Sequence, residues 1–182
     1  MPRDAWRIAS ATAIGTSHLN TGTVCQDSVL HKVLSTLSGD VLVVVVSDGA
    51  GSALYSDVGS RAATETPVES VEIALAANKE VSEFTREIAL EWLQAINVRL
   101  NEIATANEHI VRDYACTLLA AIVAPNVAAY LQIGDGAIVV SESEADGWSY
   151  IFWPQHGEYA NSTNFVVSPD AAETMAFEVG PG

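Results

Sequence analysis

The sequence predicts an α+β fold in which two helices cover a largely antiparallel sheet. Short apolar segments of strand type come first, two long segments with helical periodicity follow, and further strand segments joined by short turns come after them. Strands joined by tight turns pair antiparallel, and helices grouped apart from strands are typical of this class. With 182 residues and 49% hydrophobic composition, residues 1–182 are expected to form a single domain that buries a core without disulfides.

The first strands are indicated by apolar residues between turn signals. We expect strands at about Trp6–Ile14, Ser28–Val33 and Val41–Ser47. The last of these is a β-branched run of the kind found in buried strands. The glycine-containing triplet 38–40 supplies the turn between the second strand and the third.

Two helices should follow this hairpin. Asp57 is a candidate cap for the first helix, expected from near Val58 towards Ala77, and Pro67 predicts a kink or a break inside it. The second helix is expected over Val81–Ala106, where apolar residues recur at helical spacing. These apolar residues are interpreted as core.

The second half of the chain returns to strands. We expect them near Cys116–Ala124, Val127–Ile133, Ala137–Ser141 and Trp148–Trp153. The Pro-Asn pair at 125–126 makes the turn between the first two. No internal repeat or low-complexity tract interrupts the pattern.

The charge and cysteine content exclude several classes of function. Only eight Lys and Arg residues stand against 23 Asp and Glu, which gives a net charge of -15, so we expect no nucleic-acid partner. Two cysteines without a metal-binding spacing are interpreted as reduced, buried packing residues. The N-terminus lacks a secretory signal and no segment is long enough to span a bilayer, so we expect a cytoplasmic protein with no membrane partner.

Three aspartates stand where predicted strands begin or end. Asp48 follows the run at 41–47 and precedes Gly49, Asp135 lies between two glycines after the strand that ends at Ile133, and Asp27 precedes the second strand. The glycines allow close approach of the backbone. The acids predict a shared cation site, although an Asp-Gly pair after a strand is also the common signal of a hairpin turn.

The order of the motifs resembles the bacterial branch of the metal-dependent serine/threonine protein phosphatases of type 2C, the PPM-type family. The motifs are Gly15-Thr-Ser-His18, Gly22-Thr-Val-Cys-Gln26-Asp27 and Ser47-Asp48-Gly49-Ala-Gly51-Ser52. Segments 117–123, 133–138 and 157–163 also fall where that branch has them. The resemblance runs from about Trp6 to Phe177.

The resemblance implies a four-layer α-β-β-α sandwich with two central sheets. It also implies two Mg²⁺ or Mn²⁺ ions, or three, held by oxygen ligands at one end of the sheets. Such an ion pair lowers the pKa of a water molecule that attacks the phosphoester of phosphoserine or phosphothreonine. The expected activity is therefore protein dephosphorylation in signalling, with a phosphorylated protein as substrate and a serine/threonine kinase as a candidate partner.

The resemblance also assigns roles to residues. Asp48 would bridge the metals, Gly49 would offer its carbonyl oxygen, Asp27 would hold a ligand beside them, and Asp135 matches the aspartate of an additional metal. Gln26 stands where many relatives have glutamate and would ligate through its amide oxygen. The catalytic residues expected on this basis are Asp48, Asp27 and His18. Of these, His18 would replace an arginine of the relatives.

The substrate side of the site departs from better-studied relatives. His18 is a candidate for contact with the substrate phosphate, because Gly22 stands where those relatives carry an arginine. Glu158 and Asn161 are candidates to line the substrate entrance, although the segment around them reads equally well as a polar surface loop.

The family normally continues with another strand ending in Ser-Asp-Gly and a closing aspartate pair, and this chain has neither after Asp135. The domain is therefore expected to be C-terminally incomplete. The alternative to an active enzyme is a truncated pseudophosphatase, a module that binds a phosphoprotein or a kinase without turnover.

Overall fold

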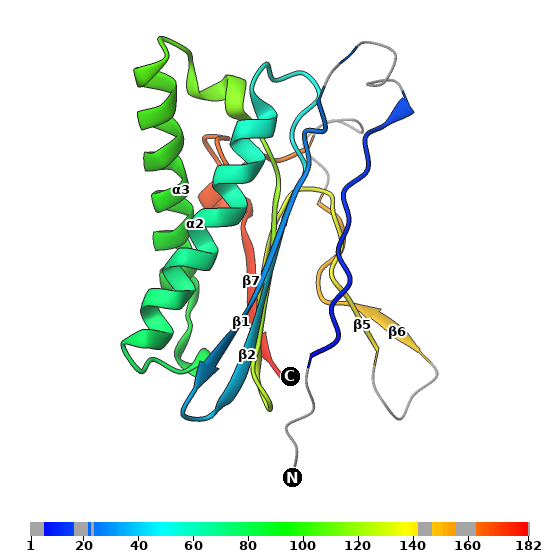
Figure 1. Cartoon of the computed structure of the whole chain (residues 1–182), viewed down its shortest axis with the longest axis vertical. Coiled ribbons are helices and arrows are strands. Elements are labelled where there is room, and N and C mark those ends of the chain that lie inside the picture. The colour runs from blue at the N-terminus through cyan, green and yellow to red at the C-terminus, as the bar shows by residue number, and fades with distance from the viewer. Residues whose placement is uncertain (1–5, 17–21, 23, 142–146, 156–162, 182) are drawn as a thin grey trace.

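The computed structural model describes residues 6–16, 22, 24–141, 147–155 and 163–181. A five-stranded antiparallel sheet with strand order β1-β2-β3-β4-β7 forms its centre. Helices α2 and α3 cover one face of this sheet, while the two-stranded sheet β5–β6 and the N-terminal segment lie on the other side (Figure 1). The α+β fold class is confirmed.

The central sheet is built from hairpins. Strands β1 (Ser28–Thr36) and β2 (Gly39–Ser47) form the first one and pair from Ser28 opposite Ser47 to Thr36 opposite Gly39. In β2 the residues Val41, Val43 and Val45 are buried beneath the helices, whereas Leu42 and Val44 between them face the opposite side. The alternation places Asp48 on the face without helices.

The other three strands continue the sheet. β3 (Leu118–Val123) pairs with β2 and with β4 (Ala128–Ile133), and the edge strand β7 (Ala176–Gly180) pairs with β4. Every residue of β4 is buried. The small sheet consists of β5 (Val139–Ser141) and β6 (Trp148–Tyr150).

The helical layer differs in its boundaries from the prediction. α2 (Ser56–Ala76) begins two residues earlier than expected, with Tyr55 as its N-cap. Asp57 lies in its first turn, where the positive end of the helix dipole stabilises a carboxylate. The helix is assigned without interruption through Pro67, so the predicted break was wrong. Next to it, the hydroxyl of Thr66 donates to the backbone oxygen of Ala62.

The second predicted helix is two elements. A 3₁₀ helix η1 (Val81–Glu83) is followed by α3 (Arg86–Ala106), whose N-cap Thr85 accepts a hydrogen bond from the backbone N–H of Ile88. Shorter elements that the sequence did not reveal are η2 (Val111–Tyr114) and α4 (Ala171–Thr174).

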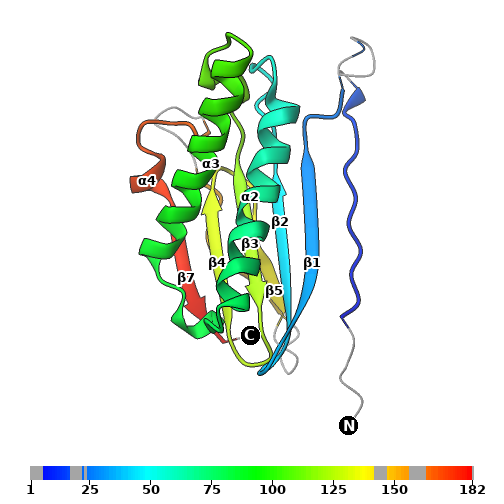
Figure 2. The same ribbon diagram turned by 60° about the vertical axis from the view of Figure 1, so that its left-hand side comes forward.

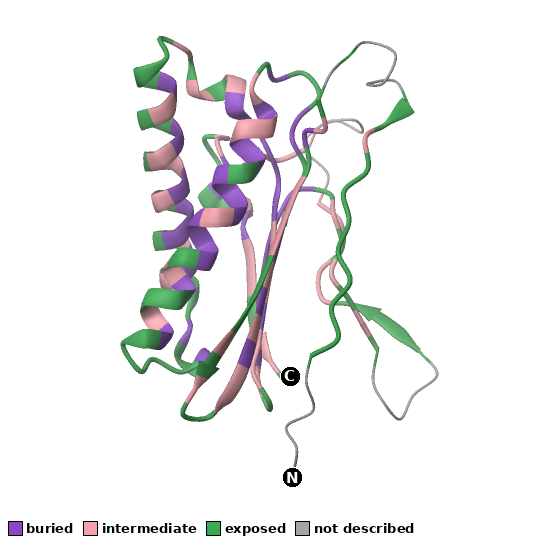
Figure 3. Cartoon of the chain, in the orientation of Figure 1, coloured by how far each residue is buried: buried purple, intermediate pink, exposed green. Residues whose placement is uncertain are grey.

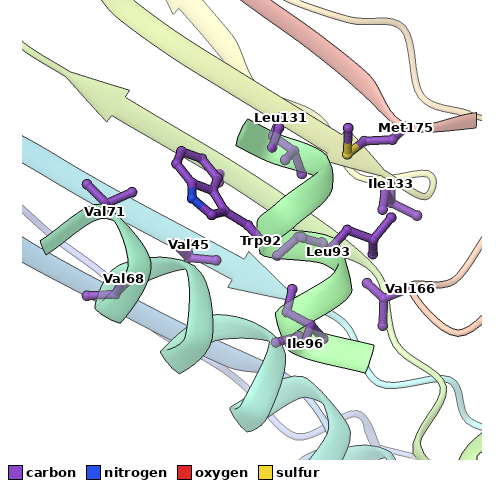
Figure 4. Close-up of a cluster of buried hydrophobic side chains, with 14 of the residues drawn as sticks. Val45, Val68, Val71, Trp92, Leu93, Ile96, Leu131, Ile133, Val166 and Met175 are labelled. Carbon is purple, nitrogen blue, oxygen red and sulfur yellow. The ribbon is translucent and has the colours of Figure 1, made fainter. Parts of the chain in front are cut away.

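The main core lies between the helical layer and the sheet. Trp92, Leu93 and Ile96 of α3 point towards the sheet and are at most 4% exposed. Figure 4 shows them with Val68 and Val71 of α2 and with further buried residues from several elements, of which it labels Val45, Leu131, Ile133, Val166 and Met175. This burial of apolar area fixes the sheet beneath the helices and therefore also fixes its strand ends.

The expected first strand, Trp6–Ile14, was wrong as a strand. Residues 6–15 run beside β1 on the side away from the helices (Figure 2), without ladder hydrogen bonds to the described strands. A side-chain contact between Ser10 Oγ and His31 Nδ1, at 3.4 Å, joins this segment to β1. Because no described strand pairs with it, the segment is mostly exposed, as Figure 3 shows.

Of the four layers that the resemblance implies, the described residues form one helical layer, the main sheet and a small part of a second sheet. None of the described helices is long and apolar enough to cross a membrane.

Candidate functional site

The predicted site begins where the β1–β2 hairpin opens. Ser28 is paired with Ser47, so the same register places Asp27 opposite Asp48 and Gln26 opposite Gly49. Residues directly opposite in an antiparallel pair lie on the same face of the sheet. The two carboxylates therefore meet at the edge of the face without helices.

Two hydrogen bonds with Thr117, the residue before β3, fix the backbone of Asp48. The N–H of Asp48 donates to Thr117 Oγ1 at 2.9 Å, and the N–H of Thr117 donates to the carbonyl oxygen of Asp48 at 2.8 Å. One residue further, Gly49 forms a bridge with Cys116, and the N–H of Ala50 donates to the oxygen of Ala115 at 2.9 Å. The N–H and carbonyl of Gly49 consequently point away from Cys116.

The third predicted acid comes from the end of β4. Continuing the β3–β4 register places Gly134 opposite Thr117, and Gly134 has φ +111° and no room for a side chain, because a Cβ would lie 2.6 Å from Thr117 Cγ2. Asp135 follows at the turn and accepts a hydrogen bond from Thr163 Oγ1 at 3.1 Å. The loop carries this carboxylate towards the other two.

The three acids interact electrostatically. Partial burial, the charge of Asp27, a hydrogen bond with Asp27 and the charge of Asp135 together raise the pKa of Asp48 from 3.8 to about 6, with burial as the largest cause. Like charges gathered in a partly buried place destabilise one another. A cation bound between them would relieve this repulsion.

Two hollows meet at the acids. The larger, of about 750 Å³, runs between the N-terminal segment and the sheet, and the smaller, of about 300 Å³, lies over Gln26 and Gly49. Asp27 and Asp48 line both of them, while Asp135 lines only the larger. The carboxylates are therefore open to solutes.

The residues present fit a hard divalent cation. Carboxylate, amide and carbonyl oxygens are the ligands that Mg²⁺ and Mn²⁺ prefer. Gln26 supplies a second observation, because its Oε1 is buried without a hydrogen-bond partner among the described residues. Its Nε2 donates to the oxygen of Ala53 at 3.5 Å, which leaves the carbonyl end for a ligand.

Gly49 lies next to these oxygen ligands and tolerates no side chain. A Cβ at this position would lie 2.5 Å from the backbone oxygen of Gln26 and 2.9 Å from Ser56 Cβ, so only glycine fits. Among the described residues no three His, Cys, Asp or Glu side chains are arranged to hold one ion. Neutral oxygens such as those of Gln26 and Gly49 would have to complete the ligand set.

The structure thus brings together five of the predicted site residues: Gln26, Asp27, Asp48, Gly49 and Asp135. His18, Glu158 and Asn161 lie outside the described residues.

Sequence reasoning missed the residues that hold the motif in place. Buried Ser60 of α2 donates from its hydroxyl to the oxygen of Gln26 at 2.6 Å, and Ser47 Oγ donates to the oxygen of Thr117 at 2.6 Å. A small polar residue in a helix or at a strand end carries no distinctive sequence signal. Only the packing of α2 and of the segment before β3 against the strand ends reveals these contacts.

The two cysteines differ from each other. Cys116 is fully buried beside the site, and burial raises the pKa of its thiol to about 12. Cys25 was expected to be buried but is only partly so, and its Sγ lies 3.9 Å from Asp27 Oδ2. It precedes β1 and lines the smaller hollow.

Comparison with known proteins relates this chain to protein phosphatases. The family model described as protein phosphatase 2C matches residues 14–182. Serine/threonine-protein phosphatase 3 of Escherichia coli (strain K12) is 31% identical over 172 residues, which cover 94% of this chain and 66% of the relative. The chain thus spans just under two thirds of the length of that relative.

Solved structures support the same fold. A bacterial serine phosphatase superimposes with a TM-score of 0.61 at 16% identity, over 86% of this chain and 67% of that one. The serine/threonine phosphatase Stp1 from Staphylococcus aureus gives the same score and identity over 86% of this chain and 65% of its own. With the family model matching nearly the whole chain, this protein belongs to the protein phosphatase 2C family.

Proposed function

We propose that this chain hydrolyses phosphoserine and phosphothreonine in proteins, with Mg²⁺ or Mn²⁺ held at the strand-end site. The observation that carries the proposal is the position of Asp27 opposite Asp48 at an accessible edge, where partial burial and the neighbouring charge of Asp27 raise the pKa of Asp48 to about 6. The similarity to an Escherichia coli protein named as a serine/threonine-protein phosphatase supports it.

Each residue of the cluster has a proposed part. Asp48 would contact two ions through its carboxylate, Gly49 through its carbonyl oxygen and Gln26 through its amide oxygen. Asp27 would orient the water beside them, and Asp135 would contact an additional ion. When bound, such ions lower the pKa of a water molecule so that it attacks phosphorus in line.

The substrate side of the proposal involves His18 for contact with the phosphate, and Glu158 and Asn161 at the entrance. A phosphorylated protein is the proposed substrate, and a serine/threonine kinase acting on the same protein is the proposed partner in signalling. We place this activity in the cytoplasm. The alternative of a pseudophosphatase is not favoured, because the family and the relative carry phosphatase names.

The test is hydrolysis of p-nitrophenyl phosphate and of a phosphothreonine peptide with and without Mn²⁺. We expect turnover that requires the metal and falls by about 10²-fold or more in Asp48→Ala, because the variant loses the ligand shared by the ions. The matched control is Asp170→Ala, which removes an exposed carboxylate that caps no helix through its side chain. Full activity in Asp48→Ala, or equal loss in both variants, would refute the mechanism.

A further inference from the structure

Two adjacent residues near the start of α2, Gly59 and Ser60, contact the segments that support the two acids facing each other across the hairpin. Ser60 contacts the segment that carries Asp27. Gly59 packs against the backbone of Tyr114, which leads into the residues that pair with the segment of Asp48. Both residues of α2 are buried. One short piece of helix therefore touches the supports of both carboxylates.

On the Asp27 side, a hydroxyl group fixes a peptide unit. The Oγ of Ser60 donates to the carbonyl oxygen of Gln26 at 2.6 Å, and this carbonyl belongs to the peptide that joins Gln26 to Asp27. A Cβ at position 49 would lie 2.5 Å from the same oxygen, so the carbonyl occupies the narrow space between Gly49 and Ser60. Because a buried carbonyl needs a hydrogen-bond donor, Ser60 sets the plane of the peptide from which Asp27 starts.

On the Asp48 side, the helix contacts backbone directly. A Cβ added to Gly59 would lie 2.1 Å from the carbonyl oxygen of Tyr114 and 2.8 Å from its carbonyl carbon, so α2 approaches this backbone as closely as glycine allows. The three residues after Tyr114 pair with residues 48–50, and this pairing includes both hydrogen bonds between Thr117 and Asp48. The start of α2 is thereby placed relative to Asp48.

We propose that Ser60 is a positioning residue, which holds Asp27 at the distance from Asp48 that a divalent cation between them requires. The inference rests on the proposed function, because the cation is the one that this function uses. Carboxylates of like charge repel each other when they are close and partly buried, so the metal-free protein needs a rigid support to keep them together. The packing of α2 against both segments supplies this support, and Ser60 is its contact with the peptide next to Asp27.

A second hydroxyl of the same helix allows a positioning role to be separated from a structural one. Thr64 lies one turn after Ser60, is 1% exposed, and shares a hydrogen bond with the hydroxyl of Ser28 at 2.9 Å. It joins α2 to β1 as Ser60 joins α2 to the segment before β1, but it contacts a side chain and not the peptide before Asp27. Thr64→Val therefore weakens the docking of the helix and leaves the Gln26 carbonyl with its donor.

The experiment is isothermal titration calorimetry of the full chain with Mn²⁺, together with urea unfolding of each variant in EDTA. Ser60→Ala removes the donor to the Gln26 carbonyl, and we expect the Mn²⁺ dissociation constant to rise by about 10- to 100-fold, the usual effect of removing a residue that orients a metal ligand. Thr64→Val is the matched control. It should lower the urea midpoint as Ser60→Ala does and leave the Mn²⁺ dissociation constant unchanged.

Ser60→Thr keeps the hydroxyl and should retain the Mn²⁺ affinity of the wild type. If this variant has the urea midpoint of the wild type but binds Mn²⁺ as weakly as Ser60→Ala, the hydroxyl is not the cause and the inference is overturned. An equal rise of the dissociation constant in Ser60→Ala and Thr64→Val would overturn it too, because helix docking alone would then explain the loss.

The wild type separates a failure of this inference from a failure of the proposed function. A wild type that binds Mn²⁺, with an unchanged dissociation constant in Ser60→Ala, would overturn the role of Ser60 and leave the proposed function standing. A wild type that neither binds Mn²⁺ nor hydrolyses p-nitrophenyl phosphate would overturn the proposed function, and this inference with it.

Discussion

Thr117 forms hydrogen bonds with both the backbone N–H and the backbone carbonyl of Asp48. Its Oγ1 accepts from the N–H of Asp48 at 2.9 Å, and its own N–H donates to the carbonyl oxygen of Asp48 at 2.8 Å. Thr117 is itself 3% exposed and packs against Gly134. One buried threonine therefore links the strand ends that carry Asp48 and Asp135.

Thr117→Val tests this link with a side chain of nearly the same shape. The variant leaves the N–H of Asp48 without its acceptor, and we expect the free energy of unfolding to fall by about 1–3 kcal/mol. Mn²⁺ affinity, measured by calorimetry, should fall as well, because Asp48 is no longer held in place. Thr117→Ser keeps the hydroxyl and should retain Mn²⁺ affinity; equal affinities of the valine and serine variants would contradict the prediction.

The stability of the metal-free protein should depend on pH through Asp48. Its pKa is raised from 3.8 to about 6 in the folded state, so the folded chain binds this proton more tightly than the unfolded chain. The resulting stabilisation is complete below pH 3.8 and is lost as the pH rises through about 6.

Urea unfolding in EDTA at about pH 5 and about pH 7.5 measures this loss, with Asp48→Asn as the isosteric variant that does not titrate. Relative to Asp48→Asn, the wild type should lose stability towards the higher pH, and Mn²⁺ should restore it. Parallel behaviour of the two proteins over this range would rule out Asp48 as the group responsible.

The sequence was sufficient to predict that Asp27 meets Asp48 because the register of the hairpin between β1 and β2 is local. A short hairpin between β1 and β2 places position 27 opposite position 48, and the run of valines identifies the strand that ends at Asp48. Periodicity also identified both long helices. These features depend on neighbours in sequence, which a pattern can represent.

Other features depend on tertiary contacts and could not be read in this way. β7 is five residues long and is a strand because it pairs with the edge of β4. Residues 6–15 have strand-type composition but no described strand to pair with. The contact of Ser60 with Gln26 joins residues 34 apart, and neither residue type signals it.

Gly49→Ala should be strongly destabilising although the change is one methyl group. The added Cβ would lie 2.5 Å from the oxygen of Gln26 and 2.9 Å from Ser56 Cβ, so the strand ends must separate, and overpacking of this kind costs about 1–3 kcal/mol. Gly51→Ala is the matched control in the same loop, because nothing lies within 4 Å of its Cβ position. Thermal unfolding of both variants tests the prediction. Equal midpoints would show that the strand ends separate at no cost in stability, which contradicts it.

Gln26→Glu should convert a neutral ligand into a charged one. The Oε1 of Gln26 is buried without a partner among the described residues, and Gln26 lines the same hollow as Asp27 and Asp48. A third carboxylate there should lower the stability of the metal-free protein, because like charges repel, and should raise Mn²⁺ affinity.

We expect the Mn²⁺ dissociation constant of Gln26→Glu to fall about tenfold, equivalent to about 1.4 kcal/mol, with urea midpoints lowered in EDTA and raised in Mn²⁺. Gln94→Glu adds the same charge at an exposed position of α3 and controls for the change in net charge. Because the two variants have identical net charge, only proximity to Asp27 and Asp48 can separate them. Identical Mn²⁺ affinities would mean that the side chain at position 26 does not reach the ion, and Gln26 would then have to be removed from the proposed ligand set.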